Sequence, residues 1–172
     1  CIVAPKGFKA GTTYCGIKIA KDSLDLGIIF SEYPATGAAL FTTNQIYAAP
    51  VGLSKKIIQK GCVRAFIINS GNANACTGEQ GYKDAGEMLR IAAKYLKISA
   101  DELLVASTGI IGRPLPMDKI AIGIKTAAAS LGNAPEHGNA MARAIMTTDT
   151  KQKDIAVKVK ISNKDVTIGG IT

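Results

Sequence analysis

Three short stretches of the chain contain residue types that could stabilise or bind a reacting group. The first begins where the apolar run 103–106 gives way to Ser-Thr-Gly, at Thr108 and Gly109. A strand that ends in small residues exposes backbone N–H groups, and with the Thr108 hydroxyl beside them these suit the oxyanion that develops in acyl transfer. The plainer interpretation is a glycine-rich turn between a strand and a helix, and this stretch on its own favours the turn.

The second stretch reads Asn-Ser-Gly-Asn-Ala-Asn and lies between an apolar run and a long helix. The amides of Asn69, Asn72 and Asn74 offer donors and acceptors, and the small residues between them permit unusual backbone angles. Such a segment is either one wall of a polar pocket or an asparagine-stabilised turn. Its density of polar groups directly after a core strand favours the pocket wall.

The third stretch places the hydroxyls of Thr147, Thr148 and Thr150 around Asp149 at the expected end of a helix. These groups could bind the carboxylate or the amino group of a small ligand. A hydroxyl-rich helix end followed by a turn would have the same composition, and the residues alone favour that simpler interpretation.

No residue of the chain stands out as a nucleophile with a base beside it. A serine or cysteine nucleophile needs an adjacent base, yet His137 is the single histidine and is expected at the surface. The four cysteines show no C-x-x-C spacing, which argues against a zinc site and favours reduced thiols in a cytosolic protein. The sequence therefore indicates half of a site, with oxyanion donors and polar walls but no evident nucleophile.

Length and composition favour one globular domain. The chain has 172 residues, 47% of them hydrophobic, and its apolar runs are too short to span a bilayer. The formal net charge is +8, but the lysines are dispersed and aromatic residues make up only 5%. That leaves little for stacking on nucleic-acid bases, so we expect a solvated basic face or complementarity to an acidic partner chain. No secretory signal is visible, although the chain begins at Cys1.

Hydrophobic periodicity predicts a mixed sheet covered by helices. The expected strands lie at 16–20, 24–30, 38–43, 51–53, 64–69 and 103–106, followed by a hairpin of the half-buried strand 155–161 with 166–171.

Helices are expected between these strands. Ser54 would cap a short helix, and Ser99–Glu102 has the spacing of a capping box. Longer helices are expected at 117–131 and 136–146. The clearest helix precedes the capping box, because it has one apolar stripe at Ala85, Met88, Leu89, Ala92 and Leu96.

Several motifs, taken in order, resemble those of one enzyme family along essentially the whole chain. They are Ala4–Lys9, Phe41–Asn44, Ala48–Val51, Asn69–Gly81, Ala106–Gly109, Pro114–Lys119, Ala144–Thr150 and Ile168–Ile171. The chain is similar in these segments to the amino-terminal α chain of the ornithine acetyltransferases (glutamate N-acetyltransferases) of arginine biosynthesis. The segments at Asn69–Gly81 and Met146–Thr150 are the most specific.

The resemblance implies an activity and a partner. Members of that family are made as one precursor that cleaves itself before a threonine, which becomes the amino-terminal nucleophile of a β chain. The enzyme transfers acetyl from N2-acetylornithine to glutamate through an acetyl-threonine, without a metal or an organic cofactor, and some members also accept acetyl-CoA. Residues 1–172 would then be a single α-chain domain of a cytoplasmic α2β2 enzyme. Neither nucleic acid nor membrane is expected as a partner.

The resemblance also assigns roles to residues. Thr108 and Gly109 would form the oxyanion hole, Thr147 and less directly Thr148 would contact the amino-acid substrate, and the family's binding lysine and nucleophile would follow beyond Thr172. The implied fold is α/β, with two mixed sheets stacked between helix layers (an αββα sandwich) and completed by the β chain.

Two other functions are compatible with parts of the sequence. One keeps the fold and changes the acceptor to water, as in an amino-terminal-nucleophile aminopeptidase or amidase. The threonines at Thr147 and Thr148 count against it. The other is a non-catalytic basic module that binds RNA, which the dispersed lysines disfavour.

Overall fold

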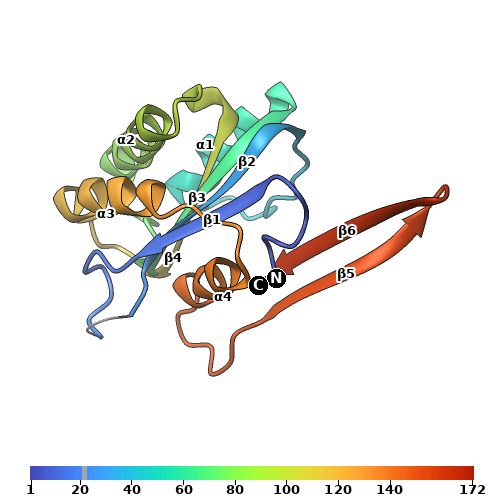
Figure 1. Ribbon diagram of the computed structural model, residues 1–172. Helices are drawn as coiled ribbons and strands as arrows, with labels where there is room; N and C mark the ends of the chain where they lie inside the picture. The colour runs from blue at the N-terminus through green and yellow to red at the C-terminus, as the bar shows by residue number, and fades with distance from the viewer. Residues whose placement is uncertain (21–22) are drawn as a thin grey trace.

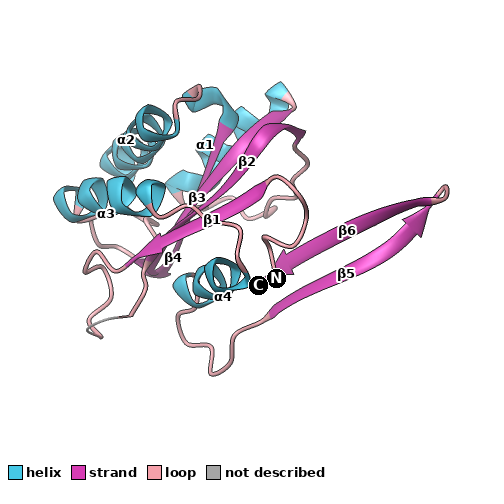
Figure 2. Cartoon of the chain, viewed as in Figure 1, coloured by secondary structure: helices cyan, strands magenta, loops and turns pink. Residues whose placement is uncertain are grey.

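The computed structural model describes residues 1–20 and 23–172 and contains a mixed sheet with helices on both faces (Figures 1 and 2). In the described residues the sheet has the order β1-β2-β3-β4. Strand β2 is antiparallel to both of its neighbours, β1 and β3, and β4 is parallel to β3. A separate hairpin pairs β5 with β6. The strands are β1 (Phe8–Thr13), β2 (Leu26–Thr36), β3 (Cys62–Asn72), β4 (Leu103–Ile110), β5 (Asp154–Ile161) and β6 (Lys164–Ile171).

The helices cover a main hydrophobic core on one face of the sheet and a smaller cluster on the other. They are α1 (Ala49–Ile57), α2 (Gly78–Leu96), α3 (Met117–Ala129) and α4 (Pro135–Ala144), with short 3₁₀ turns at Ile58–Lys60 and Ala100–Glu102. Side chains alternate across a strand, so Ile28 and Ile67 face the main core under α2 and α3, while Ile29 and Ile68 face a smaller cluster around Met141 of α4. None of the helices in the described residues is long and apolar enough to cross a bilayer.

Several expectations from the sequence are confirmed. The apolar stripe of α2 is buried at Ala85, Met88 and Ala92, and the predicted helices correspond to α3 and α4. In the capping box, the Asp101 N–H donates to Ser99 Oγ at 3.2 Å and the Ser99 N–H donates to Glu102 Oε2 at 3.0 Å. The mixed α/β class is confirmed as well.

The predictions for the first 60 residues are partly wrong. No strand forms at 16–20 or 38–43, and residues 51–53 lie inside α1. Pro50 explains the last difference, because its fixed φ suits the first helical turn and the helix starts at Ala49. Ser54 is therefore not a cap but a buried side chain in the middle of α1.

Ser54 joins α1 to the outer edge of the sheet. Its hydroxyl donates to the Val105 carbonyl at 2.8 Å and accepts from the Val105 N–H at 3.0 Å. Strand β4 has only β3 as a neighbour in the described sheet, so these two backbone groups would otherwise lack a partner. A single hydroxyl therefore satisfies one residue of an edge strand inside the core.

The hairpin is exposed where the sequence predicted a half-buried strand. Every residue of β5 is exposed, including Ile155 at 63% and Ile161 at 56%. The reason is placement, because β5 and β6 extend away from the body of the molecule (Figure 2). Only the base of the hairpin is tied down, with the Cys1 amino group 3.9 Å from Asp154 Oδ1.

The carboxylate of Asp25 fixes the segment that follows β1. Asp25 is fully buried and accepts backbone N–H bonds from Cys15, Gly16, Ile17 and Lys18 at 2.7 to 3.2 Å. Charge-assisted bonds of this kind offset the cost of removing a carboxylate from water. The four residues are thus held in a tight loop rather than in the predicted strand.

We predict that replacing Ser54 with alanine destabilises the fold by about 1–3 kcal/mol, because the Val105 backbone groups lose their buried partner. Denaturant unfolding of the complete protein measures the effect. Lys55→Ala, an exposed change on the same helix, is the control and should shift stability by less than about 0.5 kcal/mol. Equal stability of the Ser54 variant and the control would contradict the assigned role.

We also predict that Cys15 resists alkylation in the native protein. Burial, with the nearby Asp25 carboxylate, raises the pKa of the Cys15 thiol to about 12, so the reactive thiolate is scarce at pH 8. Cys76 is exposed and serves as the internal control. Mass spectrometry after iodoacetamide treatment should find Cys76 modified well before Cys15, and unfolding should abolish the difference. Equal rates in the native protein would contradict the prediction.

Candidate functional site

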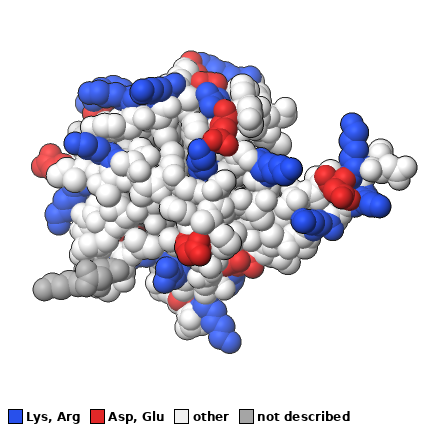
Figure 3. All heavy atoms as spheres, viewed as in Figure 1, with Lys and Arg blue, Asp and Glu red and all other residues white. Residues whose placement is uncertain are grey.

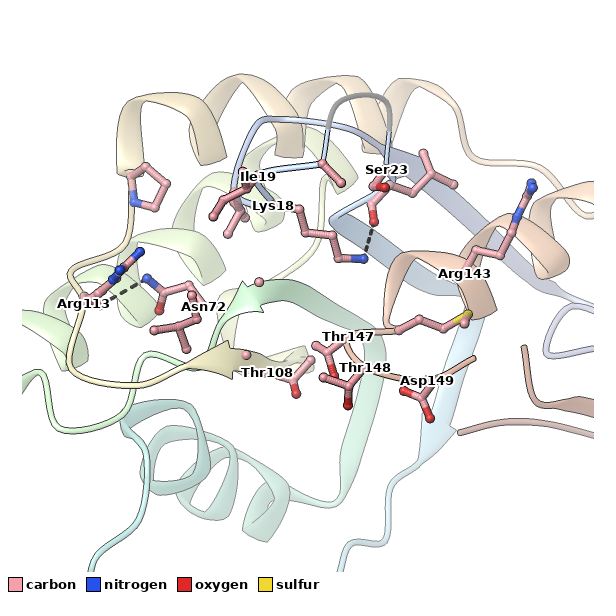
Figure 4. A pocket seen from close by; sticks show the side chains of 18 of the residues that line it. Lys18, Ile19, Ser23, Asn72, Thr108, Arg113, Arg143, Thr147, Thr148 and Asp149 are labelled. Atoms are coloured by element: carbon pink, nitrogen blue, oxygen red, sulfur yellow. Dashed lines mark hydrogen bonds between the residues drawn. The ribbon is translucent and has the colours of Figure 1, made fainter. Parts of the chain in front are cut away.

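A pocket of about 1340 Å³ lies at the carboxyl ends of the parallel strands β3 and β4. Figure 4 shows the residues around it. The lining joins parts of the chain that are far apart in sequence: residues after β1, the ends of β3 and β4, the turn before α3 and the segment after α4. Six residues singled out in the sequence lie on this pocket: Asn72, Thr108, Gly109, Thr147, Thr148 and Asp149.

The end of β4 differs from the sequence prediction. The strand does not stop at Ala106 but continues to Ile110, paired with β3. Because β4 lies at the edge of the described sheet, every second N–H group of this strand points away from β3. Backbone groups alternate in direction along a strand, and Gly109 belongs to the same set as Val105, whose groups point away from β3 to Ser54.

Gly109 has no tolerance for a side chain. Its φ is 132°, a region that other residues rarely adopt, and an added Cβ would lie 2.4 Å from the carbonyl carbon of Gly71. Gly71 is its register partner on β3 and has a φ of 98°. These two glycines let the strands approach closely at the pocket.

Thr147 and Thr148 follow the end of α4. The hydroxyl of Ser70, at the end of β3, donates to the carbonyl of Ala144, the last residue of α4. This bond holds the segment after the helix against the sheet. Thr147 and Thr148 are exposed, and in Figure 4 they lie on the same side of the pocket as Thr108.

Only one of the three asparagines expected in the pocket wall lines the pocket. Asn72 does so, and its amide donates to the Arg113 and Pro114 carbonyls at 3.1 Å. Asn69 and Asn74 are fully buried.

The two buried asparagines instead hold backbone together, so the pocket-wall prediction is wrong for them. The Asn69 amide donates to the Asn72 carbonyl at 2.8 Å and its oxygen accepts from Ser107. The Asn74 amide donates to the Gly81 carbonyl at 2.8 Å, which fixes the start of α2. Buried amides need such partners, because an unpaired polar group in the core is costly.

Lys18 was not predicted from the sequence. Its ammonium group reaches into the pocket opposite Thr147 and Thr148 (Figure 4). Its Nζ donates to the Leu24 carbonyl at 2.7 Å. Burial lowers the pKa of Lys18, and the nearby Asp25 opposes that shift. The signal in the sequence was an aspartate between two leucines at the start of an apolar strand, which indicates a buried carboxylate that needs donors.

The charged groups around the pocket are mostly cationic. Arg113 and Arg143 are exposed at its rim, and Asp149 is paired with Lys153 at 2.5 Å, which lowers the pKa of Asp149. Across the visible face of the molecule, Lys and Arg are interspersed with Asp and Glu (Figure 3). Such a rim favours ligands with a carboxylate or another anionic group.

The described lining of the pocket contains no histidine or cysteine. His137 lies in the first turn of α4, packed against Gly132, and is not part of the lining. Among residues 1–20 and 23–172, no three His, Cys, Asp or Glu side chains gather as a metal site would require. What the chain does provide is a strand edge with hydroxyls beside it, which suits a developing oxyanion.

Comparisons with known proteins agree on one family. The ArgJ family model matches residues 9–172. The arginine biosynthesis bifunctional protein ArgJ of Caldanaerobacter subterraneus is 49% identical over 169 residues, and that of Symbiobacterium thermophilum is 46% identical over 171. The alignments cover 98% and 99% of this chain but 41% and 42% of the relatives, so the chain spans less than half of their length.

Solved structures give the same answer. A crystal structure of the arginine biosynthesis bifunctional protein ArgJ of Bacillus halodurans matches with a TM-score of 0.94 at 38% identity, covering 99% of this chain and 88% of that one. Ornithine acetyltransferase of Mycobacterium tuberculosis, solved in complex with ornithine, matches with a TM-score of 0.90 at 38% identity, covering 99% and 90%. The expected family is thereby confirmed: this chain belongs to the ArgJ family.

Proposed function

We propose that residues 1–172 form the α-chain domain of a glutamate N-acetyltransferase (ornithine acetyltransferase) of arginine biosynthesis. The observation that supports this most directly is the pocket, which brings the Thr108–Gly109 edge together with Thr147 and Thr148. The Thr108 hydroxyl and the Gly109 N–H suit an oxyanion, and the hydroxyls of Thr147 and Thr148 suit the carboxylate or amino group of an amino acid. The ornithine bound in the Mycobacterium tuberculosis relative is the same class of ligand.

The reaction divides into two acyl transfers. A threonine hydroxyl from the partner chain attacks the acetyl carbonyl of N2-acetylornithine, and its proton passes to the α-amine of the same threonine. The Thr108 hydroxyl and the Gly109 N–H stabilise the resulting oxyanion. The C–N bond then breaks, and ornithine leaves with the proton. The amine of glutamate then attacks the acetyl-threonine carbonyl and gives a proton to the α-amine, which passes it to the threonine oxygen as the ester C–O bond breaks. N-acetylglutamate leaves and the threonine hydroxyl is restored. Acetyl-CoA would be a second donor in a bifunctional enzyme.

The partner in this proposal is a β chain from the same precursor, in αβ units that assemble as α2β2 in the cytoplasm. This chain covers 88% of the solved chain from Bacillus halodurans, so the two are similar in length. The full-length relative from Caldanaerobacter subterraneus is more than twice as long as this chain, which covers 41% of it. That difference supports processing into two chains.

Uncovered apolar surface also supports a partner chain. A second hollow of about 430 Å³ exposes Phe66, Leu104 and Ala106 on the face of the sheet that α2 and α3 do not cover. Together with the exposed strand β5, this face offers the second sheet of the sandwich a surface to pack on.

Intact-mass analysis of the complete gene product, with amino-terminal sequencing, tests the proposal. We expect two co-purifying chains, the second beginning with threonine, and acetyl transfer from N2-acetylornithine that depends on glutamate. Release of acetate without glutamate would favour the amidase alternative. A single chain without transfer activity would contradict the proposal.

We predict that Thr108→Val lowers kcat for acetyl transfer about 100-fold, because one oxyanion donor is lost while the β-branched shape is kept. Thr108→Ser restores the hydroxyl and should recover most of the rate. Thr126→Ala, which removes an exposed hydroxyl on α3, is the control and should leave the rate unchanged. Full activity of a folded Thr108→Val enzyme would remove Thr108 from the mechanism.

We further predict that Thr147→Ala raises the KM for N2-acetylornithine about tenfold, the size expected for one lost hydrogen bond to the substrate. Thr150→Ala, in the same exposed segment but outside the pocket lining, is the matched control. Steady-state kinetics of both variants provide the comparison. An unchanged KM in Thr147→Ala would show that this hydroxyl does not touch the substrate.

A further inference from the structure

We propose that Lys18 binds the α-carboxylate that both amino-acid substrates share, and so sets the acetyl group against the Thr108–Gly109 edge. The inference rests on the proposed function and adds a residue from the loop after β1, which none of the sequence motifs singled out. Lys18 is distinct from the binding lysine expected beyond Thr172, because it lies in the part of the chain described here.

The position of Lys18 follows from its contacts with β3. A Cβ built on Gly71 would lie 3.1 Å from Lys18 Cγ and 3.2 Å from the Lys18 backbone nitrogen, so the lysine stem packs directly on this glycine. Gly71 is in turn the register partner of Gly109. Gly71 therefore lies between Lys18 and Gly109, the residue proposed to stabilise the oxyanion.

The Lys18 ammonium group makes one recorded hydrogen bond within the described residues. One of its three N–H donors goes to the Leu24 carbonyl, and within residues 1–20 and 23–172 no acceptor is recorded for the other two, which can meet a ligand at the pocket surface. Lys18 is half-buried, whereas Arg113 and Arg143 at the rim are exposed. A half-buried cation has lost part of its hydration, and burial lowers its pKa, so a carboxylate ligand stabilises its charged form.

The chemistry of the two substrates selects the α-carboxylate. Ornithine carries a cationic side chain and glutamate an anionic one, so a lysine cannot attract the side-chain ends of both. The α-carboxylate is common to them and lies on the carbon that bears the acetylated nitrogen. A cation close to the oxyanion edge is thus placed for this group in both halves of the reaction.

Hydrogen bonds hold residues 15–18, the segment that presents Lys18, in one backbone conformation. The Lys18 N–H is one of the four that donate to the buried Asp25 carboxylate. From outside, Lys119 of α3 donates to the Gly16 carbonyl of the same loop at 3.4 Å. Binding to a preorganised cation costs less entropy than ordering a free lysine.

Steady-state kinetics of Lys18→Met in the complete, processed enzyme test the proposal with N2-acetylornithine and its α-carboxamide. We expect Lys18→Met to lower kcat/KM for N2-acetylornithine about 10- to 100-fold, the range for one lost charged hydrogen bond. For the carboxamide, which lacks the negative charge, the two enzymes should differ by less than about threefold. Lys18→Arg keeps the charge and should recover part of the loss.

Lys119→Met is the matched control, because Lys119 contacts the same loop without lining the pocket. If it reproduced the pattern of Lys18→Met, or if Lys18→Met impaired both substrates equally, Lys18 would act through the loop and the proposal would be overturned.

Calorimetry with ornithine and ornithinamide separates this proposal from the proposed function. A wild-type enzyme that fails to transfer acetyl would contradict the function. Tighter binding of ornithine than of ornithinamide, lost in Lys18→Met, would still support the carboxylate site. Equal binding of the two ligands by wild-type enzyme, or no binding of either, would overturn it.

Discussion

The buried residue Asp25 ties together the elements that enclose the pocket. Its N–H donates to the Thr13 carbonyl at 3.1 Å, its carbonyl accepts from the Ser70 N–H at 2.8 Å, and its carboxylate receives the four N–H groups of residues 15–18. The end of β1, the start of β2 and the end of β3 thus meet at one residue. A charge fully removed from water persists only with such partners, so the loop geometry and the buried charge require each other.

Around this point the chain builds the pocket that we propose as one side of an acyl-transfer site. The glycine pair at 71 and 109 lets β3 and β4 approach, and the edge position of β4 leaves alternate amides without a partner strand in the described sheet. Ser54 satisfies one such residue in the core, whereas Gly109 opens on the pocket. In our proposal, the same strand edge stabilises the fold at Val105 and offers an oxyanion donor at Gly109. The nucleophile that we propose comes from another chain, which explains why no base accompanies these groups.

Local signals in the sequence predicted the parts of the fold that depend on local physics. The stripe of α2, the Ser99–Glu102 capping box and the pairing of the hairpin strands are all found in the structure as predicted. The predictions are wrong where contacts between distant segments determine the local structure or its burial. Residues 16–20 have a composition compatible with a strand, but the amides of Gly16, Ile17 and Lys18 donate to the Asp25 carboxylate. Strand β5 alternates as a half-buried strand would, yet none of its residues is covered by the described part of the chain.

The candidate site was predictable to a similar extent. The motifs at Thr108–Gly109 and Thr147–Thr148 were visible as small and hydroxyl-bearing residues after expected core elements, and the fold brings them to one pocket. Asn69 and Asn74 share the same composition, yet they are buried as backbone clamps. Composition cannot distinguish an amide that lines a pocket from one that lies beneath it. Lys18 was missed because its position depends on the loop folding around the Asp25 carboxylate, which neither composition nor periodicity indicates.

The central claim is that this chain stabilises the oxyanion of a covalent acetyl transfer, and isotope exchange tests it most directly. The complete enzyme is incubated with N2-acetylornithine and radiolabelled ornithine in the absence of glutamate. An acetyl-enzyme that forms reversibly predicts that the label enters N2-acetylornithine at a rate comparable to turnover. If label entered only when glutamate was present, or not at all in an enzyme that forms N-acetylglutamate, no covalent intermediate would exist and the account would be contradicted.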